Sequence, residues 1–562
     1  MNCWSVLAGI VSSQGDMATY LHPGVYVQEL PGPQLITAAA TSNTAFVGIT
    51  ETGPYNQAVL ITSWHQYVAT FGGMMWGAQL PFAVYSFFVQ GGAVCYVVRA
   101  GPNPPNAESP AGYLDGALQI NAACPGSWGD SLAVTVTNYP VPTDPNDTSV
   151  KPVFAINVLY KMPDAGTDPS FYDQLVAFYA SANKLAVQTI NGESYYQVES
   201  FPGYSAADMQ KATATSLSNI ESKINATSIF IRVAVTTTGA TRPENQLQPV
   251  ALSGGTGDPT STPLQLTTAL AALDIINDIS LLVAPESVSI PDLGLQREVV
   301  QQSVTYCENR PHLDLFYIAD PPFGLSVQDI EAFKTGAASP DGSVPEGSAL
   351  HSSYGALYYP WITFLNPSSN MNVPIPPSGA MAGTYAATDT AIGPWQVAAG
   401  ITYGVLNIAT GVTQVLTDSD QDTLNPNGIN AIRPFVNYGI CAYGGRTMST
   451  DPSLIYISVR RLLIEIEVSL YSGLQWVVFE PNTQKLWGTV TRDVSDFLTT
   501  MWQAGALFGA SAAQAFAVQC DAGNNPPDLQ AQGQLYVDIK VCPVFPAEFV
   551  IIRIQQATLG SS

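Results

Sequence analysis

A short strand near the start of the chain has no partner beside it in the sequence. Residues 24–30 read GVYVQEL, and Pro23 and Pro31 bound this segment on both sides. The alternation of apolar and polar side chains over a few positions is typical of a β-strand. No hairpin partner lies next to it, and a lone strand is not stable in water. The segment must therefore pair either with the edge of a sheet in its own domain or with another molecule.

The composition suits a protein whose surface is largely covered by other copies. Only 11% of the 562 residues are charged, whereas an average soluble domain has roughly 25%. The length predicts about two to four domains. No uninterrupted apolar run reaches the ~18 residues that a membrane span needs, so we expect no direct membrane insertion. The expected surface is rich in Thr, Ser, Ala, Gly and Gln, and composition alone leaves a monomer with a polar, uncharged coat equally open.

Charge and cysteine content narrow the partners and the compartment. The net charge is −24, and Arg460–Arg461 is the only adjacent basic pair. Because phosphate binding needs clustered Lys and Arg, nucleic acid is not an expected partner. The seven cysteines lie far apart with no C-x-x-C, which favours reduced thiols in a cytosol. The apolar stretch within residues 1–21 follows no Lys or Arg, so we expect an N-terminal arm, or a start at Met17, and no secretory signal.

Apolar periodicity predicts a mixed α/β fold with discontinuous parts. Four short apolar runs predict strands that are buried on both faces. These runs are residues 44–50, 94–98, 279–285 and 312–322. Helical patterns at 80–92 and 293–310 accompany them, as in β–α–β units. From about 101 to 250 the sequence is β-rich with proline-rich turns, which predicts an insertion into the α/β part.

Near the C-terminus two amphipathic helices precede two strands. The helices are predicted at residues 456–471 and 484–505, and the strands at 533–541 and 547–554. The repeating apolar residues are Val459, Leu462, Leu463, Ile466 and Leu470 in the first helix and Leu486, Val490, Val494, Phe497 and Met501 in the second. Asn482 or Thr483 is expected to cap the second helix, and Gly505 to end it. Arg460 and Arg461 are expected to pair with nearby acids such as Glu465.

No constellation of residues predicts catalysis or metal binding. No Gly precedes a Lys, so there is no Walker-type phosphate loop, and the four His lie far apart. GDSLA at 129–133 lacks the final Gly of a nucleophile elbow, and the Gly-rich residues 252–258 favour a domain junction over an anion site. Cys307 near His312 is more simply a buried thiol, and the Asp-rich residues 417–426 lack the Gly and Glu of an EF-hand loop. We expect no catalytic site, no metal and no cofactor.

A set of motifs follows in order along most of the chain from 22 to 556. It comprises HPGVYVQELPG, TSNTAFVGITETGP, FVQGGAVCYVVRA, CPGSWGDSLAVTV, LSGGTGD, CENRPHLDLFYIADPP, YGALYYPWI, IPPSGAMAG, LNPNGINAIRPF, GGRTMSTDPSLIYISVRRLLIEIEVSL, WVVFEPN, LW and CPVFPAEFVIIRIQQ. The ordered set resembles the contractile tail sheath proteins of phage tails and related contractile injection particles. Residues 1–21 and about 140–250 are not matched by these motifs.

The resemblance implies a multidomain sheath fold with discontinuous domains and an extended arm at each end. The implied parts are an N-terminal arm (1–30), a middle α/β domain (31–100 with 251–354), a β-rich outer insertion (101–250) and a C-terminal tube-proximal domain with a terminal strand arm (355–562). Each arm is expected to add a strand to a sheet in a neighbouring subunit. The residues expected in this exchange are Val25, Tyr26, Val27, Gln28, Glu29, Leu535, Val537, Ile539, Phe549, Val550, Ile551, Ile552 and Arg553. Without the resemblance, an edge strand of its own domain is the simpler interpretation of residues 24–30.

The resemblance also implies a structural function rather than an enzymatic one. The expected assembly is a helical polymer of stacked hexameric rings that surrounds an inner tube and contracts to drive it through a target cell envelope. Expected partners are identical subunits, the inner tube protein, and baseplate and tail-terminator or cap proteins, in a virion tail or injection particle assembled in the cytoplasm of the producing cell. The helix at 484–505 or the helix at 456–471 is expected to contact the tube, and the alternative is that both only pack in the core. The candidate contact residues are Asp493, Asp496, Thr500 and Gln503, expected on the outward face of the second helix. The alternatives are a static shell or baseplate component of the same particles and, less favoured, an enzyme.

Overall fold

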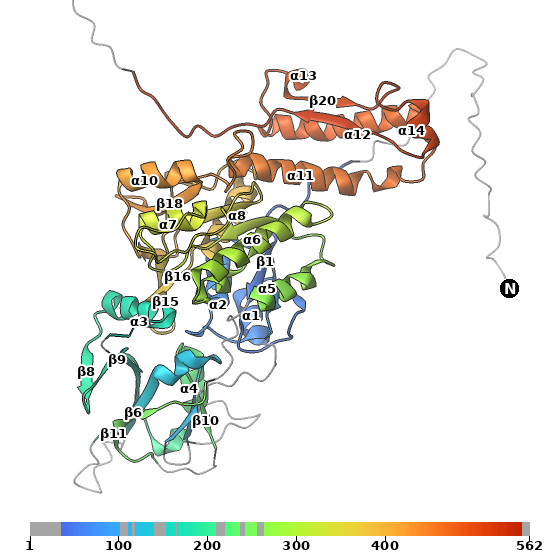
Figure 1. The fold of residues 1–562 in the computed structure, drawn as a ribbon. Helices are drawn as coiled ribbons and strands as arrows, with labels where there is room; N and C mark the ends of the chain where they lie inside the picture. Colours follow the sequence, from blue (N-terminus) through green and yellow to red (C-terminus); the bar gives the residue numbers. More distant parts are fainter. Residues whose placement is uncertain are drawn as a thin grey trace, which may run out of the picture.

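The computed structural model describes residues 35–101, 111–114, 118–139, 153–164, 166–167, 169–209, 220–236, 242–255 and 263–553. Within these residues the elements form three tiers (Figure 1). A central α/β body lies between a β-rich tier at one end and a tier of long helices at the other. The mixed α/β class is the one that the sequence predicts. The predicted strand at residues 24–30 lies outside the described residues.

The central body is built on an eight-stranded sheet with the order β19-β18-β14-β13-β12-β1-β3-β2. The strands are β1 (Thr44–Gly48), β2 (Ala58–Ile61), β3 (Cys95–Arg99), β12 (Leu281–Val283), β13 (Phe316–Ala319), β14 (Gly355–Tyr359), β18 (Ile429–Phe435) and β19 (Gly439–Ala442). The strands from β18 to β3 pair in parallel, while β2 and β19 are antiparallel at the two edges. Every residue of β1, β12, β13 and β14 is buried, as expected for parallel strands covered on both faces. The four predicted apolar strands are confirmed as β1, β3, β12 and β13.

Strands from the C-terminal part of the chain belong to the same sheet. β14 pairs with β13 on one side and with β18 on the other. The predicted boundary between residues 354 and 355 therefore falls inside one continuous sheet. The division of the chain into domains stays a prediction.

Side chains that alternate along the strands form two separate cores. Phe46 packs in one core with helices α2 (Leu80–Val89) and α8 (Ser378–Ala391). Ala45 and Val47 pack in the other core with α5 (Pro263–Leu270), α6 (Leu293–Asn309) and α7 (Val327–Thr335). Helices α2 and α8 approach closely because Gly379 faces α2: a Cβ atom there would lie 2.4 Å from the Cα atom of Ala83. The predicted helices at 80–92 and 293–310 are confirmed as α2 and α6.

Shorter elements surround this sheet. The helices are α1 (Trp64–Phe71), α9 (Gly400–Tyr403) and α10 (Asp418–Leu424). A small antiparallel sheet has the order β16-β15-β17, with β15 at Ile362–Asn366, β16 at Met371–Ile375 and β17 at Ala409–Val412.

The β-rich tier holds two further antiparallel sheets, with the orders β11-β6-β7-β9-β8 and β10-β5-β4. Their strands are β4 (Ala111–Leu114), β5 (Leu118–Ala122), β6 (Leu132–Asn138), β7 (Phe154–Lys161), β8 (Val187–Ile190), β9 (Glu193–Tyr204), β10 (Ile231–Val235) and β11 (Gln246–Ala251). The tier also contains α3 (Phe171–Ala182) and α4 (Ile220–Thr227), which the sequence analysis does not predict. Proline-rich turns dominate the sequence pattern here and obscure these two short helices.

The β-rich tier lies against the carboxyl ends of the parallel strands. Trp76, in the loop before α2, donates its backbone N–H to the carbonyl of Ile229 (2.7 Å). The Trp76 ring stacks on Phe230 with 4.7 Å between centroids. Arg232 pairs with Glu51, which follows β1, at 2.7 Å. These contacts cover the sheet edge at which doubly wound folds usually bind ligands.

The third tier contains two long helices and a two-stranded sheet. Its elements are α11 (Ile457–Gly473), α12 (Gln484–Gln503), α13 (Ala512–Ala515), β20 (Phe516–Gln519), α14 (Pro527–Ala531) and β21 (Asp538–Val541). The hydroxyl of Thr483 accepts from the backbone N–H of Leu486, which confirms the predicted cap, and Gly505 follows the helix with φ +88°. The five predicted apolar residues of α12 are all buried. None of the helices in the described part of the chain is long and apolar enough to cross a membrane.

Candidate functional site

The point where strand order reverses is the usual ligand site of a doubly wound sheet. Here the reversal lies between β1 and β12, and the side chain of Glu286 occupies it. Its Oε1 atom accepts from the backbone N–H groups of Ile49 (3.2 Å), Gln79 (2.9 Å) and Leu80 (2.8 Å). Leu80 is the first residue of α2. The carboxylate thus lies at the helix N-terminus, where such folds hold an anion.

The anion position of this fold is therefore filled by the chain's own carboxylate. Glu286 is 0% exposed, and a Cβ atom at Gly48 would lie only 2.6 Å from its Cγ atom. Within the described ranges, no group of three His, Cys, Asp or Glu residues is placed to hold a metal ion.

Substitution of Glu286 is expected to change both stability and its pH dependence. Glu286→Ala leaves three buried donors unpaired, at about 1–3 kcal/mol each, so we expect the free energy of unfolding to fall by at least about 3 kcal/mol. Glu286→Gln retains an acceptor oxygen and is the matched control, with a much smaller loss. Equal stability of the two variants in urea denaturation would contradict this role.

The pH dependence follows from the pKa of the same group. Burial raises the pKa of Glu286 to about 7, against the opposing effect of the three amides. Unfolded Glu titrates near about 4.3, so the folded state binds the proton more tightly. The resulting stability is fully present below about pH 4 and is lost as the pH rises through about 7. Glu286→Gln should therefore make the fall in Tm between about pH 5 and about pH 8 shallower. Burial also raises the pKa values of Glu199 and Asp320 to about 7, so part of the fall in Tm with rising pH should remain in this variant.

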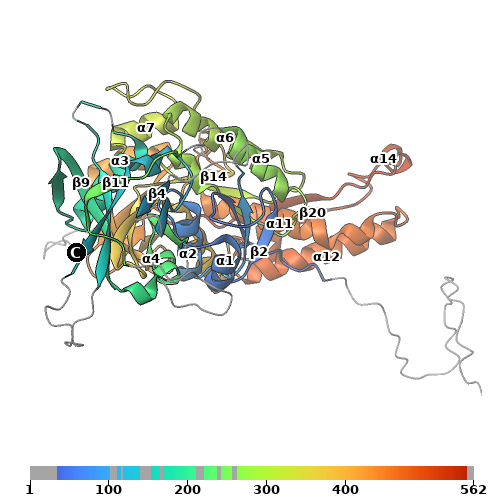
Figure 2. The same ribbon diagram turned by 90° about the horizontal axis from the view of Figure 1, so that it is seen from below.

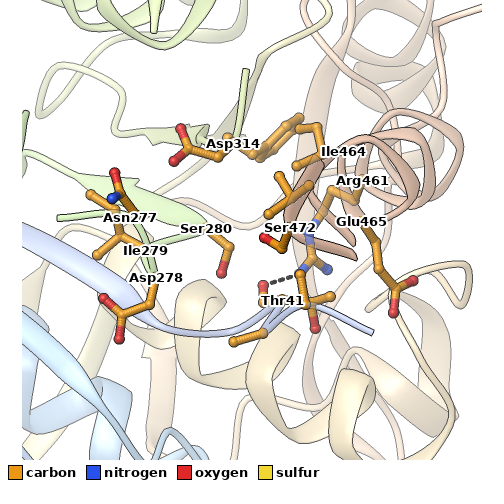
Figure 3. A pocket seen from close by; sticks show the side chains of 14 residues that line it. Thr41, Asn277, Asp278, Ile279, Ser280, Asp314, Arg461, Ile464, Glu465 and Ser472 are labelled. Atoms are coloured by element: carbon orange, nitrogen blue, oxygen red, sulfur yellow. Dashed lines mark hydrogen bonds between the residues drawn. The ribbon is translucent and has the colours of Figure 1, made fainter. Parts of the chain in front are cut away.

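The N-terminal linker, residues 35–43, is bound along α11. A cavity of about 190 Å³ lies between this linker, the start of the sheet strands and α11 (Figure 3). The backbone N–H of Ala39 donates to the hydroxyl of Ser469 (2.9 Å), and Arg461 donates to the carbonyl of Thr41 (2.9 Å). Ile36 contacts Gly473 at the C-terminal end of α11, where an added Cβ atom would lie 2.7 Å from Ile36 Cγ2.

The two adjacent arginines form ion pairs within the chain, but not with Glu465. Arg461 pairs with Asp389 on α8, with N–O distances of 2.9 and 2.5 Å. Arg460 pairs with Glu467 (3.0 Å). The prediction of a nearby acid is confirmed for Arg460, but Glu465 itself is not the partner. For Arg461 the prediction was wrong, because tertiary packing brings Asp389, 72 residues away, to its guanidinium. Burial raises the pKa of Glu465 to about 7, and the Asp389 charge adds to this rise.

A two-stranded sheet packs on α12 and is open at its edges within the described residues. β20 and β21 are antiparallel, with Phe516 opposite Val541 and Gln519 opposite Asp538. Leu535, Val537 and Ile539 alternate with exposed residues and pack against the α12 core. Of the predicted strand at 533–541, only Asp538–Val541 is paired. Each strand therefore leaves one row of backbone groups available to a further strand.

The C-terminal segment leaves this sheet and runs along the central body away from α12 (Figure 1). Residues 543–553 include no strand longer than an isolated bridge at Pro543. Phe549, Val550, Ile551 and Ile552 are between 72% and 79% exposed. The predicted strand at 547–554 is therefore absent from the described residues, because the chain places no partner strand beside it. Four consecutive exposed apolar side chains indicate a surface that another molecule covers.

The described linker and the described C-terminal segment are attached at opposite ends of α11. The linker meets the C-terminal end of this helix at Gly473, whereas Glu548 of the C-terminal segment contacts Tyr456, its N-cap residue. A helix of 17 residues is about 25 Å long. Figure 2 shows α11 and α12 projecting from the central body.

The prediction of which residues lie on the outward face of α12 is only partly correct. Asp496, Thr500 and Gln503 are exposed. Asp493 is 2% exposed, and its carboxylate accepts from Arg492 (3.0 Å), so its predicted outward placement is wrong. The buried stripe of α12 is wider than one apolar residue per turn and includes the position next to Val494. Arg492, half-exposed, belongs to the outward face, and the sequence analysis missed it.

Sequence reasoning also missed the side chains that hold the C-terminal segment. The carboxylate of Glu548 is bound by Arg446, Asn425 and Tyr456. Glu548 is the one charged residue in the otherwise apolar run AEFVII, and this isolated charge was the only local signal of its role. The predicted exchange residues Val25, Tyr26, Val27, Gln28 and Glu29 lie outside the described residues, so their pairing stays a prediction.

The C-terminal part of the chain is similar in sequence to known proteins. Residues 449–557 match the family model of the phage tail sheath C-terminal domain. The tail sheath protein of Salmonella phage ViI is 26% identical over 179 residues, which is 32% of this chain and 27% of that protein. Residues 449–557 thus resemble the C-terminal domain of phage tail sheath proteins. The match spans about a quarter of the length of that curated relative.

The sheath fold extends over nearly the whole chain. The helical sheath of the anti-feeding prophage in its contracted state aligns with a TM-score of 0.53 and 21% identity, covering 96% of this chain and 100% of that one. The sheath complex of the extracellular contractile injection system PVC, also contracted, aligns with a TM-score of 0.52 and 18% identity, covering 96% and 98%. The resemblance noted in the sequence motifs is thus confirmed at the level of the fold.

Proposed function

We propose that this chain is the repeating subunit of a contractile sheath that polymerises around an inner tube and drives it through a target cell envelope. Two observations together carry the proposal: the apolar segment Phe549–Ile552 is exposed, and elsewhere on the same chain the sheet of β20 and β21 has open edges within the described residues. If the apolar segment of one copy adds as a strand to the open sheet edge of a neighbouring copy, the segment's side chains are buried and the edge is paired. Backbone hydrogen bonds and pockets for alternate side chains would hold the added strand.

The energetics favour a mesh over isolated pairs. Each arm contributes roughly 1 kcal/mol per backbone hydrogen bond and about 1.5–3 kcal/mol per buried apolar side chain. Association costs about 4–15 kcal/mol, so one arm alone binds weakly. The linker and the C-terminal segment are attached at opposite ends of α11, which supports a subunit that links to two neighbours, so that later contacts become effectively intramolecular. Such a mesh can rearrange during contraction while its links stay closed.

The proposed role is structural and not enzymatic. The switch point of the sheet is filled by Glu286 and lies under the β-rich tier. In this account contraction draws on free energy stored during assembly, and no nucleotide is consumed. The relatives with the same fold are described as parts of sheaths, which supports a structural role for this chain.

The arrangement of tiers suggests which part meets which partner. We infer that the α11–α12 tier faces the inner tube, with Asp496, Thr500 and Gln503 as candidate contacts, and that the β-rich tier forms the outer surface. Identical subunits in stacked hexameric rings are the main partners. The tube protein, baseplate and tail-terminator or cap proteins complete the proposed particle, either a virion tail or an injection device assembled in the producing cell's cytoplasm.

Electron microscopy of the purified protein in negative stain tests this proposal. A sheath subunit should form tubes or wider contracted cylinders without other components. Small separate particles would contradict the proposal, and a single fixed geometry under all conditions would instead support a static shell or baseplate component.

A further inference from the structure

One acidic residue holds the C-terminal segment to the body of its own subunit. Arg446 binds Glu548 in a bidentate manner, with Nε–Oε1 at 2.9 Å and Nη2–Oε2 at 2.6 Å. The amide of Asn425 donates to Oε1 (2.7 Å), and the hydroxyl of Tyr456 donates to Oε2 (3.2 Å). These four residues, Asn425, Arg446, Tyr456 and Glu548, are called the Glu548 clasp below. They join the end of α10, the loop after β19 and the start of α11 to the arm.

Hydrogen bonds to Asn430 hold the backbone of Arg446 in place. The backbone N–H of Arg446 donates to the side-chain oxygen of Asn430, whose amide in turn donates to the Arg446 carbonyl (2.7 Å). Asn430 is 0% exposed within β18 of the main sheet. Arg446 therefore presents its guanidinium from a fixed backbone, and a bidentate arginine–carboxylate pair is both strong and directional. Burial would raise the pKa of Glu548, but Arg446 and Asn425 lower it by more, so that it stays below its usual range.

The clasp divides the arm into two parts with different surroundings. Before it, Phe545 contacts Tyr456 with 6.1 Å between ring centroids, and a groove of about 810 Å³ on the body is bordered by the segment from Val544 to Phe549, which ends one residue past the clasp. After it, described residues 549–553 form no hydrogen bond with the body, and Phe549–Ile552 are largely exposed. Among the described residues, the hydrogen bonds between the segment and the body thus end at Glu548.

We propose that the Glu548 clasp fixes the point at which the C-terminal arm leaves its subunit, so that the chain up to Glu548 stays on its own body and only the segment from Phe549 onward is lent to a second copy. This inference rests on the proposed function. A fixed exit point restricts the positions that the lent segment can reach, which raises its effective concentration at the neighbour's open sheet edge. The clasp stays closed in both the monomer and the polymer.

The test is the critical concentration for polymerisation of the full-length chain, measured by sedimentation. Glu548→Ala should raise it by at least about tenfold, because the arm is no longer directed. Glu548→Gln should also raise it, since the charge-assisted pair is lost. The exchanged pair Arg446→Glu with Glu548→Arg should restore it in part. Asp418→Asn is the matched control, because it breaks the Arg433–Asp418 ion pair (2.7 Å) beside the same groove, where Asp418 is 95% exposed.

A second measurement distinguishes release of the arm from unfolding of the body. Protease cleavage within residues 543–547 of the monomer should become faster in Glu548→Ala and Glu548→Gln but not in Asp418→Asn, while the Tm of the body stays unchanged. Polymerisation of both Glu548 variants at the wild-type critical concentration would overturn the clasp and leave the sheath function intact. Failure of the wild-type chain itself to polymerise would count against the proposed function instead.

Discussion

Removal of residues 549–562 is expected to leave a folded monomer that no longer forms cylinders. Residues 549–553 make no hydrogen bond to the described body, and their four apolar side chains are largely exposed, so the monomer loses little beyond the place of Phe549 at the groove. In a strand added to a neighbour, two of the four would face its core and contribute about 3–6 kcal/mol. Their loss lowers the assembly constant by a factor of about 10² to 10⁴. Sedimentation should show monomers, and the Tm should match that of the full-length monomer.

Paired substitutions provide the control for this truncation. Phe549 and Ile551 point to one face of a strand, and Val550 and Ile552 to the other. Changing one pair to Ser should weaken polymerisation much more than changing the other, because only one face meets the neighbour's core. Equal effects of the two pairs, or cylinders formed by the truncated chain at the wild-type concentration, would contradict strand addition by this arm.

Deletion of residues 1–30 is expected to give soluble, folded monomers that also fail to polymerise. The deletion ends before the described anchors of the linker on α11, namely Ile36, Ala39 and Thr41. The body should therefore keep its circular dichroism spectrum and its Tm, while the link made by residues 24–30 is lost. Deletion of residues 1–16 is the control and should leave polymerisation intact. Cylinders at normal yield from the longer deletion would show that this arm makes no essential link.

The elements that could be predicted from sequence are those with strong local patterns. TAFVG and FYIA are continuous apolar runs, and they form the buried strands β1 and β13. The apolar repeat of α12 and the hydroxyl of Thr483 similarly defined a helix and its start. In each case the residues that specify the element lie within a few positions of one another.

The features that could not be predicted depend on residues far apart in the chain. β18 reads like any short strand, and only the tertiary fold places it beside β14. Glu286 acquires its role because the sheet topology brings it to the start of α2, 206 positions away. Asn425 and Glu548 meet across 123 positions, so no local motif announces their contact.

The predicted strand at 547–554 failed for a different reason. Its composition suits a strand, as the apolar run from Phe549 to Ile552 shows, but the described part of this chain supplies no partner for it. A sequence pattern reports what a segment can form, and pairing decides what it does form. In our proposal the missing partner belongs to another copy.

Hydrogen–deuterium exchange of the monomer and of the polymer tests most directly whether neighbouring subunits pair through their arms. We predict that the amides of residues 24–30 and 549–553 exchange at the rate of an unfolded chain in the monomer and are protected on the order of 100-fold or more in the polymer. The amides at the open edges of β20 and β21 should become protected together with them. Well-formed cylinders in which both arms still exchange at the unfolded rate would contradict the account.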